Sequence, residues 1–405
     1  MKECFLVLRP KEPIRPGELK QRGDYFGSQN YIPGGLLMGS LARWLQISGR
    51  QGEIPQLVKR IRIGNLFPSP TDLAYPLPFP MTALECKFKG GFRNLPSQPN
   101  RQGTDGDQDQ AHGIRDSLLI ELVYWEIKKK GFDFPVPMIL RCTIPDANGQ
   151  PCRSRMEPVS GFYTQLDSGW VRVTVEKGLV TKVALSRQRR ASQEQMLYRV
   201  VALRPRNSFI GRLWTDAPSL VDDLKTAVSK VGIGAMTSRG FGGAEIEQVS
   251  VRHLSIEERL RLFNDRLRQV WDELTDLVLP RNHPVPRPEG TYFSVDLLSP
   301  AILKDPDGLP TLKLTLRLDG NLLQPIWWAT QPTFTGGFST AWGLPKPTSL
   351  AACQGSVYVY HTPSPQDQIL PFLQSLETNG VGDRVPDGIG EVLICHPFHQ
   401  EVNPV

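Results

Sequence analysis

The sequence predicts an α+β protein in which one unit of strand, helix, glycine loop and strand occurs twice. The first glycine loop reads Gly232-Ile233-Gly234 and, five residues later, Gly240-Phe241-Gly242. The same pattern returns 148 residues further on, as Gly380-Val381-Gly382 and Gly388-Ile389-Gly390. One such loop would be an ordinary turn. Two of them at matched spacing indicate an internal duplication.

The elements around the two loops also match. In chain order they are predicted as a strand over 198–204, a helix over 219–231 and a strand over 244–251 for the first loop, and a strand over 357–361, a helix over 369–376 and a strand over 391–395 for the second. The helices are amphipathic, as expected of helices that cover a sheet.

The N-terminal region supplies the rest of the first unit. A strand is predicted over 4–8, a helix over 36–45 and a second strand over 60–67. Strand-helix-strand followed by strand-helix-strand is the ferredoxin-like (RRM-like) order, so two such domains are expected. Residues from about 85 to 195 then form a large insertion between the second and third strands of the first domain.

A long helix over 255–279 separates the two units. Ser255 and Glu258 form a capping box at its start. Its apolar stripe consists of Leu260, Phe263, Leu267, Trp271, Leu274 and Leu277. Four prolines between 280 and 288 follow as a stiff linker, which places the first domain at 1–279 and the second at 280–405. The stripe is interpreted as packing between domains, with an exposed partner-binding helix as the alternative.

Composition favours a globular, cytoplasmic protein. Of 405 residues 40% are hydrophobic and 22% charged, and no apolar run approaches the ~20 residues of a membrane span. The six cysteines form no compact framework, which favours a reducing compartment. Residues 1–250 carry 35 Lys and Arg against 24 Asp and Glu, whereas residues 251–405 carry 12 against 17. The basic half is expected to meet a polyanion and the acidic half a protein, unless the asymmetry is chance.

The first glycine loop has the residue types of a phosphate-binding turn. Glycine adopts positive φ, so that successive backbone N–H groups can converge on an anion. The candidate RNA contacts here are Lys230, Gly232, Gly234, Arg239, Gly240, Phe241 and Gly242. The Phe241 ring could stack on a base or fix the loop to the core. A tight helix-to-strand turn without RNA remains the alternative for the whole loop.

A second candidate RNA site lies at the start of the helix over 36–45. Gly34 and Gly35 open this helix, whose free N–H groups and dipole attract phosphate. Gly39 would allow a close approach of a sugar-phosphate backbone, and Ser40 and Arg43 could donate hydrogen bonds to phosphates. The alternative is a helix that merely packs closely through Gly39.

Four residues of the insertion form a candidate metal site. Cys142 and Cys152 flank a turn-rich segment, and Cys86 and His112 are the other soft ligands nearby in sequence. A Cys3His set can hold structural zinc tetrahedrally and stabilise a segment too small for its own core. Unpaired thiols are the alternative.

The sequence gives little indication of catalysis. None of its six histidines belongs to a recognisable acid–base motif. His396 and His399 follow the last predicted strand, where a metal-independent ribonuclease could keep a general base. A surface pair of satisfied histidines is the favoured interpretation, and no catalytic residue is assigned.

The helix motif Ile32-Pro33-Gly34 to Arg43, the two glycine loops and the strand order resemble the RAMP superfamily of CRISPR-associated proteins. Pro76-Leu77-Pro78, Cys86-Lys87 and Gly161-Phe162-Tyr163 resemble the subgroup of type III-D effector complexes. The resemblance implies a non-catalytic subunit that caps the five-prime, repeat-derived handle of guide RNA. It also implies two protein partners, the large polymerase-like subunit and a backbone subunit.

The second unit departs from this pattern at one place. Residues 335–342 stand where the first unit has its glycine-led helix, which leaves RNA contact by the second domain open. The resemblance also covers real nucleases, so the alternatives are an endoribonuclease that processes precursor guide RNA and a protein-only scaffold subunit.

Overall fold

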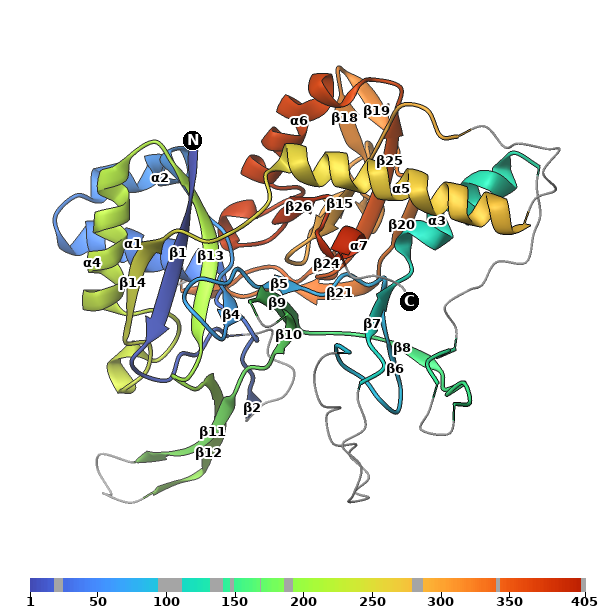
Figure 1. Cartoon of the computed structure of the whole chain (residues 1–405). Coiled ribbons are helices and arrows are strands. Elements are labelled where there is room, and N and C mark those ends of the chain that lie inside the picture. Colours follow the sequence, from blue (N-terminus) through green and yellow to red (C-terminus); the bar gives the residue numbers. More distant parts are fainter. Residues whose placement is uncertain are drawn as a thin grey trace.

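The computed structural model describes residues 1–17, 25–93, 111–131, 141–145, 149–167, 169–185, 192–278, 287–339 and 343–401. Two antiparallel sheets lie side by side, each with helices packed on it, and smaller sheets lie below and between them (Figure 1). The predicted α+β class is therefore confirmed. Across the described residues, no helix has both the length and the apolar character of a membrane span.

The first sheet has the strand order β14–β1–β13–β3, with β4 also paired to β13. Its strands are β1 (Lys2–Pro10), β3 (Ile61–Ile63), β4 (Phe67–Ser69), β13 (Ser208–Thr215) and β14 (Ala244–Val249). Helices α1 (Gly34–Ile47) and α4 (Pro218–Val231) pack against each other. Leu6 and Leu8 of β1 join the core with these helices, whereas Phe5 and Val7 join a cluster on the other face, because side chains alternate along a strand.

One predicted strand of the first half has a different role. The strand expected over 198–204 exists as the end of β12 (Ser192–Leu203), but it pairs with β11 (Lys177–Leu185) and β2 (Tyr25–Phe26) outside the main sheet. The central strand before α4 is β13 instead. Its apolar run is interrupted by Gly211 and Arg212, which hid it in the sequence.

The second sheet has the order β20–β25–β15–β26. Its strands are β15 (Thr291–Leu297), β20 (Trp327–Ala329), β25 (Val357–Thr362) and β26 (Val392–Ile394). Helix α6 (Gln366–Asn379) follows β25, as predicted. The place of a first helix, between β15 and β20, falls at residues 298–326, so the prediction that residues 335–342 occupy it is wrong. Residues 298–326, all of them described, hold two short hairpins: β16 (Leu303–Lys304) with β17 (Pro310–Thr311), and β18 (Leu316–Leu318) with β19 (Asn321–Leu323).

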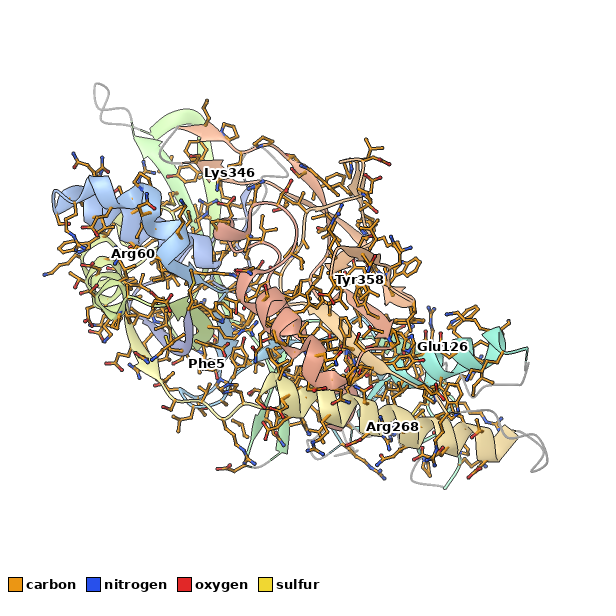
Figure 2. All side chains as sticks on the ribbon, turned by 90° about the horizontal axis from the view of Figure 1, so that it is seen from above. Phe5, Arg60, Glu126, Arg268, Lys346 and Tyr358 are labelled. Atoms are coloured by element: carbon orange, nitrogen blue, oxygen red, sulfur yellow. The ribbon has the colours of Figure 1, made fainter. Side chains whose placement is uncertain are left out.

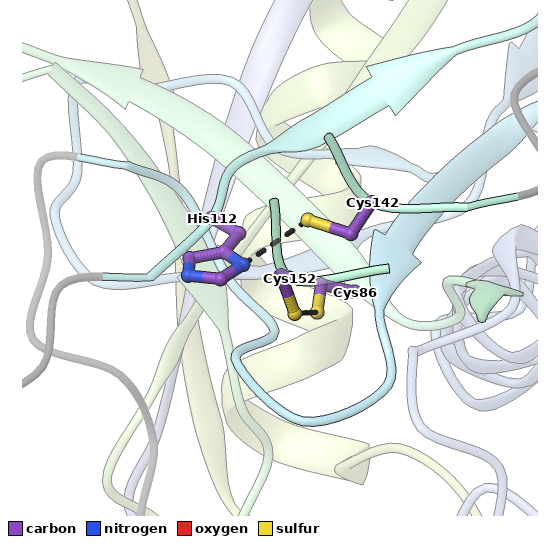
Figure 3. A group of neighbouring side chains, drawn as sticks. All are labelled: Cys86, His112, Cys142 and Cys152. Carbon is purple, nitrogen blue, oxygen red and sulfur yellow. Dashed lines mark hydrogen bonds between the residues drawn. The ribbon is translucent and has the colours of Figure 1, made fainter. Parts of the chain in front are cut away.

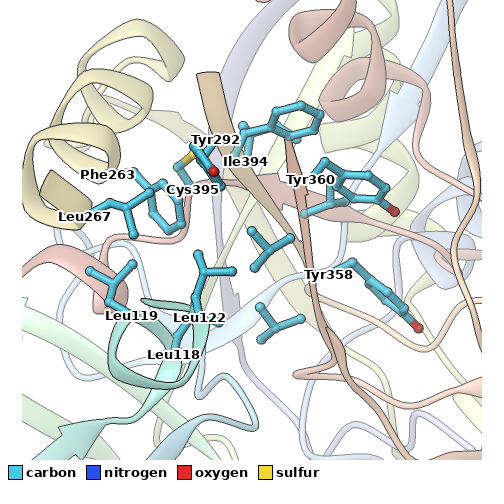
Figure 4. Packing of buried hydrophobic residues seen from close by; sticks show 14 of the residues in the cluster. Leu118, Leu119, Leu122, Phe263, Leu267, Tyr292, Tyr358, Tyr360, Ile394 and Cys395 are labelled. Carbon is cyan, nitrogen blue, oxygen red and sulfur yellow. The ribbon is translucent and has the colours of Figure 1, made fainter. Parts of the chain in front are cut away.

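The predicted long helix is α5 (Ile256–Val278), and it packs on β15 and α6. Its capping box is present, because the Glu258 N–H donates to Ser255 Oγ at 3.2 Å and the Ser255 N–H donates to Glu258 Oε2 at 2.8 Å. Its stripe from Leu260 to Leu274 is buried in one core with the second sheet, in which Phe263 and Leu267 face leucines of α3 (Leu118–Lys129) (Figure 4).

The segment between β4 and β11 builds small sheets between the two halves. The first contains β6 (Ala83–Cys86), β7 (Ile114–Asp116) and β8 (Met156–Pro158), and the second contains β5 (Leu77–Pro78), β9 (Phe162–Leu166) and β10 (Gly169–Val173). An aromatic cluster of Phe79, Phe162 and Tyr163 packs there against Phe398 of the second half. These sheets thus connect both main sheets.

Short elements complete the fold. They are α2 (Leu57–Arg60), α7 (Phe398–Glu401), β21 (Pro332–Thr335), β22 (Phe338–Ser339), β23 (Leu344–Pro345) and β24 (Ser349–Ala352). The strands β21 to β24 form two paired ribbons. Seen from above, Lys346 at the end of β23 lies on the side of Arg60 and away from Arg268 of α5 (Figure 2). The ribbon that contains Lys346 therefore extends from the second half on the side where α2 lies.

The duplication of the glycine loops is confirmed at the level of single backbone groups. All eight glycines have φ between +71° and +87°, and Met236 and Arg384, which occupy equivalent positions, have φ of 70° and 62°. The Gly242 N–H donates to Pro13 O at 2.9 Å, and the Gly390 N–H donates to Pro300 O at 2.8 Å. Each loop is thus held by the segment that follows the first strand of its own sheet.

Candidate nucleic-acid interface and metal centre

The two predicted RNA sites of the first half meet in one surface. Helices α1 and α4 pack together, and the Ser40 hydroxyl of α1 donates a 2.9 Å hydrogen bond to Gly232 O, where α4 ends and the loop begins. Ser40 is itself buried. Its position was predicted to contact phosphate, and the structure places it as a link between the helix and the loop.

Five of the predicted contacts are exposed. They are Gly39, Arg43, Lys230, Arg239 and Gly240. A Cβ at Gly39 or Gly240 would meet no atom within 4 Å, so the backbone is open to an approaching ligand at both glycines. Within the described part of the chain, none of the three cations has a carboxylate partner; Arg43 donates to Gln46 at 2.7 Å and Arg239 to the Tyr198 hydroxyl at 3.1 Å.

The start of α1 faces the protein. The Gly34 N–H donates to Asn65 Oδ1 at 3.2 Å, and a Cβ at Gly35 would lie 2.6 Å from Asp387 O of the second glycine loop. These two glycines allow the second loop to pack on the helix N-terminus. In this structure, therefore, the end of the helix that was predicted to attract phosphate is covered by Asp387 and Gly388.

The Phe241 ring is also covered, with 5% of its surface exposed. It packs against Val200 and Ala202 of β12, and the Lys182 ammonium lies 4.5 Å from its ring centroid. Of the two roles considered for this side chain, the geometry matches attachment of the loop to the hairpin rather than stacking on a base.

A buried charge network next to this surface was not predicted. Arg212 of β13 lies 2.9 Å from Glu377 and 3.3 Å from Glu391, both of the second half. Arg259 of α5 reaches the other oxygen of Glu377 at 2.7 Å, and the Asn65 N–H donates to Glu391 Oε2 at 2.7 Å. The partners are 118 to 326 residues apart, so no local pattern in the sequence reports them.

The four predicted metal ligands come together. The ligand atoms of Cys86, His112, Cys142 and Cys152 all lie within 4.8 Å of one another, and three of the four side chains are buried (Figure 3). His112 Nδ1 lies 3.1 Å from Cys142 Sγ, and Cys86 Sγ lies 3.9 Å from Cys152 Sγ. A cluster of this composition could hold a structural zinc ion.

The pKa values of the Cys86 and Cys142 thiols are shifted in opposite directions. Burial raises the pKa of the Cys86 thiol, but hydrogen bonds from the backbone of Lys89 and Phe88 and from the side chains of Ser154 and Cys152 together outweigh burial, and the net pKa is lowered. Burial, together with repulsion from thiolates at Cys86 and Cys152, raises the pKa of the Cys142 thiol to about 11. A cation between the sulfurs would remove that repulsion.

His396 and His399 are buried, with 1% and 4% exposed, so the expected surface pair is wrong. His399 bridges two carboxylates, with Nδ1 2.6 Å from Asp116 Oδ2 and Nε2 2.8 Å from Asp296 Oδ1. Burial lowers the pKa of His399, but these carboxylates outweigh burial and raise it to about 10. Burial lowers the pKa of His396 to about 4. Both side chains lie at the contact between the insertion and the second half of the chain.

Comparison with known proteins identifies a family for this chain. The family described as "CRISPR-associated protein (Cas_Cmr3)" matches residues 170–397, which is more than half of the sequence. A search of curated proteins finds no match.

Two solved structures with some likeness are of the Type III-B Cmr-beta complex. One is titled "Cryo-EM structure of the Type III-B Cmr-beta bound to cognate target RNA and AMPPnP, state 1", with 14% identity, TM-score 0.40 and coverage of 94% of this chain and 90% of that chain. A second, bound to cognate target RNA, has 11% identity, TM-score 0.37 and coverage of 92% and 89%. Because the family model matches more than half of the sequence, the chain belongs to the Cas_Cmr3 family of CRISPR-associated proteins.

Proposed function

We propose that this protein is a non-catalytic, RNA-binding subunit of a type III CRISPR effector complex in the cytoplasm, and that its first half holds the repeat-derived handle of the guide RNA. The observation that carries this proposal is the exposed surface where α1 meets the first glycine loop. Two open glycines lie there beside Arg43, Lys230 and Arg239, none of them paired with a described carboxylate. Backbone amides and unpaired cations are the groups that grip phosphates.

The members of the predicted site divide into two roles under this proposal. Gly39, Arg43, Lys230, Arg239 and Gly240 contact the RNA, because they are exposed. The others shape the surface from beneath, and they are Gly34, Gly35, Ser40, Gly232, Gly234, Phe241 and Gly242. The excess of Lys and Arg over Asp and Glu in residues 1–250 adds a long-range attraction for RNA.

The proposal includes a domain arrangement. Residues 1–279 form one ferredoxin-like RAMP domain with its insertion, and residues 280–405 form a second that lacks a first helix of its own. The connectivity of the two main sheets and the matched glycine loops support this division. The partners are the large polymerase-like subunit and a backbone subunit of the complex. Membership of the type III-D subgroup rests on the sequence resemblance alone.

An endoribonuclease is the second candidate function, since related RAMP proteins include nucleases. Cleavage without a metal needs a base near the 2′-hydroxyl of the RNA and an acid for the leaving oxygen. His396 and His399 are buried where the insertion meets the second half. His253 is exposed, donates a hydrogen bond to Val251 O and packs on the Phe5 ring. Among the residues that the structure describes, no histidine pair therefore stands ready at the proposed RNA surface.

One experiment separates these functions. The protein is purified from a host that expresses a CRISPR array, and its bound RNA is sequenced; the purified protein is then incubated with labelled precursor guide RNA, with and without magnesium. We expect bound RNA with a uniform five-prime end in the repeat and no cleavage of the precursor. A cut at the handle boundary would replace the proposal with the nuclease, and the absence of specific RNA would replace it with a protein-only scaffold.

A further inference from the structure

The metal cluster lies on a side of the small sheet β7–β6–β8 that has almost no apolar core, whereas Ala83 and Ile114 of the same sheet pack in the aromatic cluster. The buried members of its hydrophobic cluster are Cys86, Cys142 and Met156. A sheet of three strands with three or four residues each needs packing or a cross-link to be stable. In this cluster, sulfur atoms occupy the place that aliphatic side chains would otherwise fill.

Backbone hydrogen bonds hold three of the four ligands in place. The Cys142 N–H donates to Ser154 O at 2.7 Å, and the Cys152 N–H donates to Ile144 O at 2.9 Å, so these two cysteines lie diagonally across two paired segments of chain. The His112 N–H donates to Lys89 O at 2.9 Å, which holds His112 beside the turn that follows Cys86. The site is thus assembled from three stretches of chain.

The distances fit a tetrahedral ion. Zinc–sulfur bonds of about 2.3 Å and zinc–nitrogen bonds of about 2.0 Å place two sulfurs about 3.8 Å apart and a sulfur and a nitrogen about 3.5 Å apart. The Cys86–Cys152 separation of 3.9 Å matches the first value, the Cys142–His112 separation of 3.1 Å is shorter than the second, and all four ligand atoms lie within 4.8 Å of one another. Three thiolates and one imidazole are ligands that select zinc over magnesium or calcium.

The cluster is connected to the second half through β7. His112 stands directly before this strand, and the strand ends at Asp116, whose carboxylate bonds His399 at 2.6 Å. The other oxygen of Asp116 accepts the Leu118 N–H at 3.3 Å at the start of α3, and α3 packs on α5. A cross-link at His112 therefore limits the position of Asp116 and of α3.

We propose that Cys86, His112, Cys142 and Cys152 bind one structural zinc ion, which holds the β7–β6–β8 sheet together and thereby docks α3 onto the second half of the protein. This role is independent of RNA binding by the first half.

The test begins with elemental analysis of the tag-free full chain, purified without added metal. We expect about one zinc per chain in the wild type and in Cys353→Ser, whose cysteine lies outside the cluster, and a loss of most of the zinc in Cys86→Ser and Cys142→Ser. A wild type without zinc, or cysteine variants that keep one zinc per chain, would overturn the site.

Hydrogen exchange on the wild type tests the second part and needs no variant to fold. Chelation should speed exchange in residues 83–93, 111–131 and 141–158, leave β1 and β13 unchanged, and be reversed by zinc chloride. Zinc loss that leaves residues 114–129 as protected as before would overturn the docking role. RNA binding is not measured in either assay, so these outcomes are separate from the test of the proposed function.

Discussion

Arg43 and Arg239 stand on the two sides of the proposed RNA surface, one on α1 and one at the end of the first glycine loop. Each contact with a phosphate releases counterions, so that the affinity for RNA falls as salt rises. Replacing both arginines with alanine should weaken binding of a handle oligonucleotide and reduce the slope of log K against log salt by about 1.4, at about 0.7 for each contact with a single strand. Fluorescence anisotropy over a salt series measures this slope.

The matched control removes two arginines elsewhere. Arg261 and Arg268 are exposed on α5, and each pairs with Asp265, so Arg261→Ala with Arg268→Ala changes the net charge equally. This variant should keep nearly the wild-type slope. Equal slopes in both double variants would show that only the total charge of the protein matters. An unchanged slope in Arg43→Ala with Arg239→Ala would show that these two arginines do not contact the RNA.

Residue types with a distinctive chemistry could be predicted from the sequence, and others could not. The four ligands Cys86, His112, Cys142 and Cys152 were found because soft ligands are few in the insertion. Arg212 and Glu391 could not be found, since buried arginines and glutamates look like surface residues until their partners are known. The Phe241 ring is buried because it packs on the β11–β12 hairpin, and the residues near the loop do not indicate this contact.

At the scale of elements, the glycine loops are the feature that sequence and structure describe most alike. Position after position, the two loops share positive φ, hydrogen bonds and a short 3-10 turn (Thr237–Arg239 and Val385–Asp387). The helices α4, α5 and α6 were also predicted closely, because amphipathic periodicity and caps are local signals. Strand β13 was not predicted because Gly211 and Arg212 are unusual in a central strand. Both residues are accommodated by contacts with neighbouring segments, which the residues of β13 alone do not indicate.

The close packing of these loops leads to a prediction for Gly390. A Cβ there would lie 1.9 Å from Val381 O, and φ is 73°. At Gly308, φ is 85° but a Cβ would meet no atom within 4 Å. Gly308→Ala should therefore cost only the left-handed backbone term of about 1–2 kcal/mol, whereas Gly390→Ala should add about 1–3 kcal/mol for the clash.

Thermal unfolding followed by circular dichroism compares the two variants under one condition. The midpoint of Gly390→Ala should fall clearly below that of Gly308→Ala. Similar midpoints would mean that the second loop can open between Gly390 and Val381 at little cost in stability.

At the scale of the whole molecule, buried charges join the two halves. Glu391 of the second half accepts hydrogen bonds from Asn65 and pairs with Arg212, both of the first half. Losing one member of such a network leaves an uncompensated buried charge, which costs about 3–5 kcal/mol. These contacts between Glu391, Asn65 and Arg212 hold the two halves together. They could not be predicted, because they form only when segments far apart in the sequence meet.

His399 lies at the contact between the insertion and the second half, and its titration predicts how stability changes with pH. His399 faces Asp116 of β7 and Asp296 of β15, with the neutral His396 and Arg266 of α5 nearby. Its pKa of about 10 in the folded protein lies above the value of about 6.5 in an unfolded chain. The stabilisation by protonated His399 is therefore complete below pH 6.5, declines as pH rises, and is lost above pH 10.

Over pH 7.5–9.5 this histidine should lower the free energy of unfolding by up to about 1.4 kcal/mol for each pH unit. His399→Gln should be less stable than the wild type at pH 7.5, because it leaves two buried carboxylates without a cation, and its stability should depend less steeply on pH over this range. His253→Gln, at an exposed histidine, should keep the wild-type slope. Urea unfolding at a series of pH values measures all three slopes. A His399→Gln slope as steep as that of the wild type would mean that His399 is already neutral at pH 7.5, and that Asp116 and Asp296 hold it through hydrogen bonds alone.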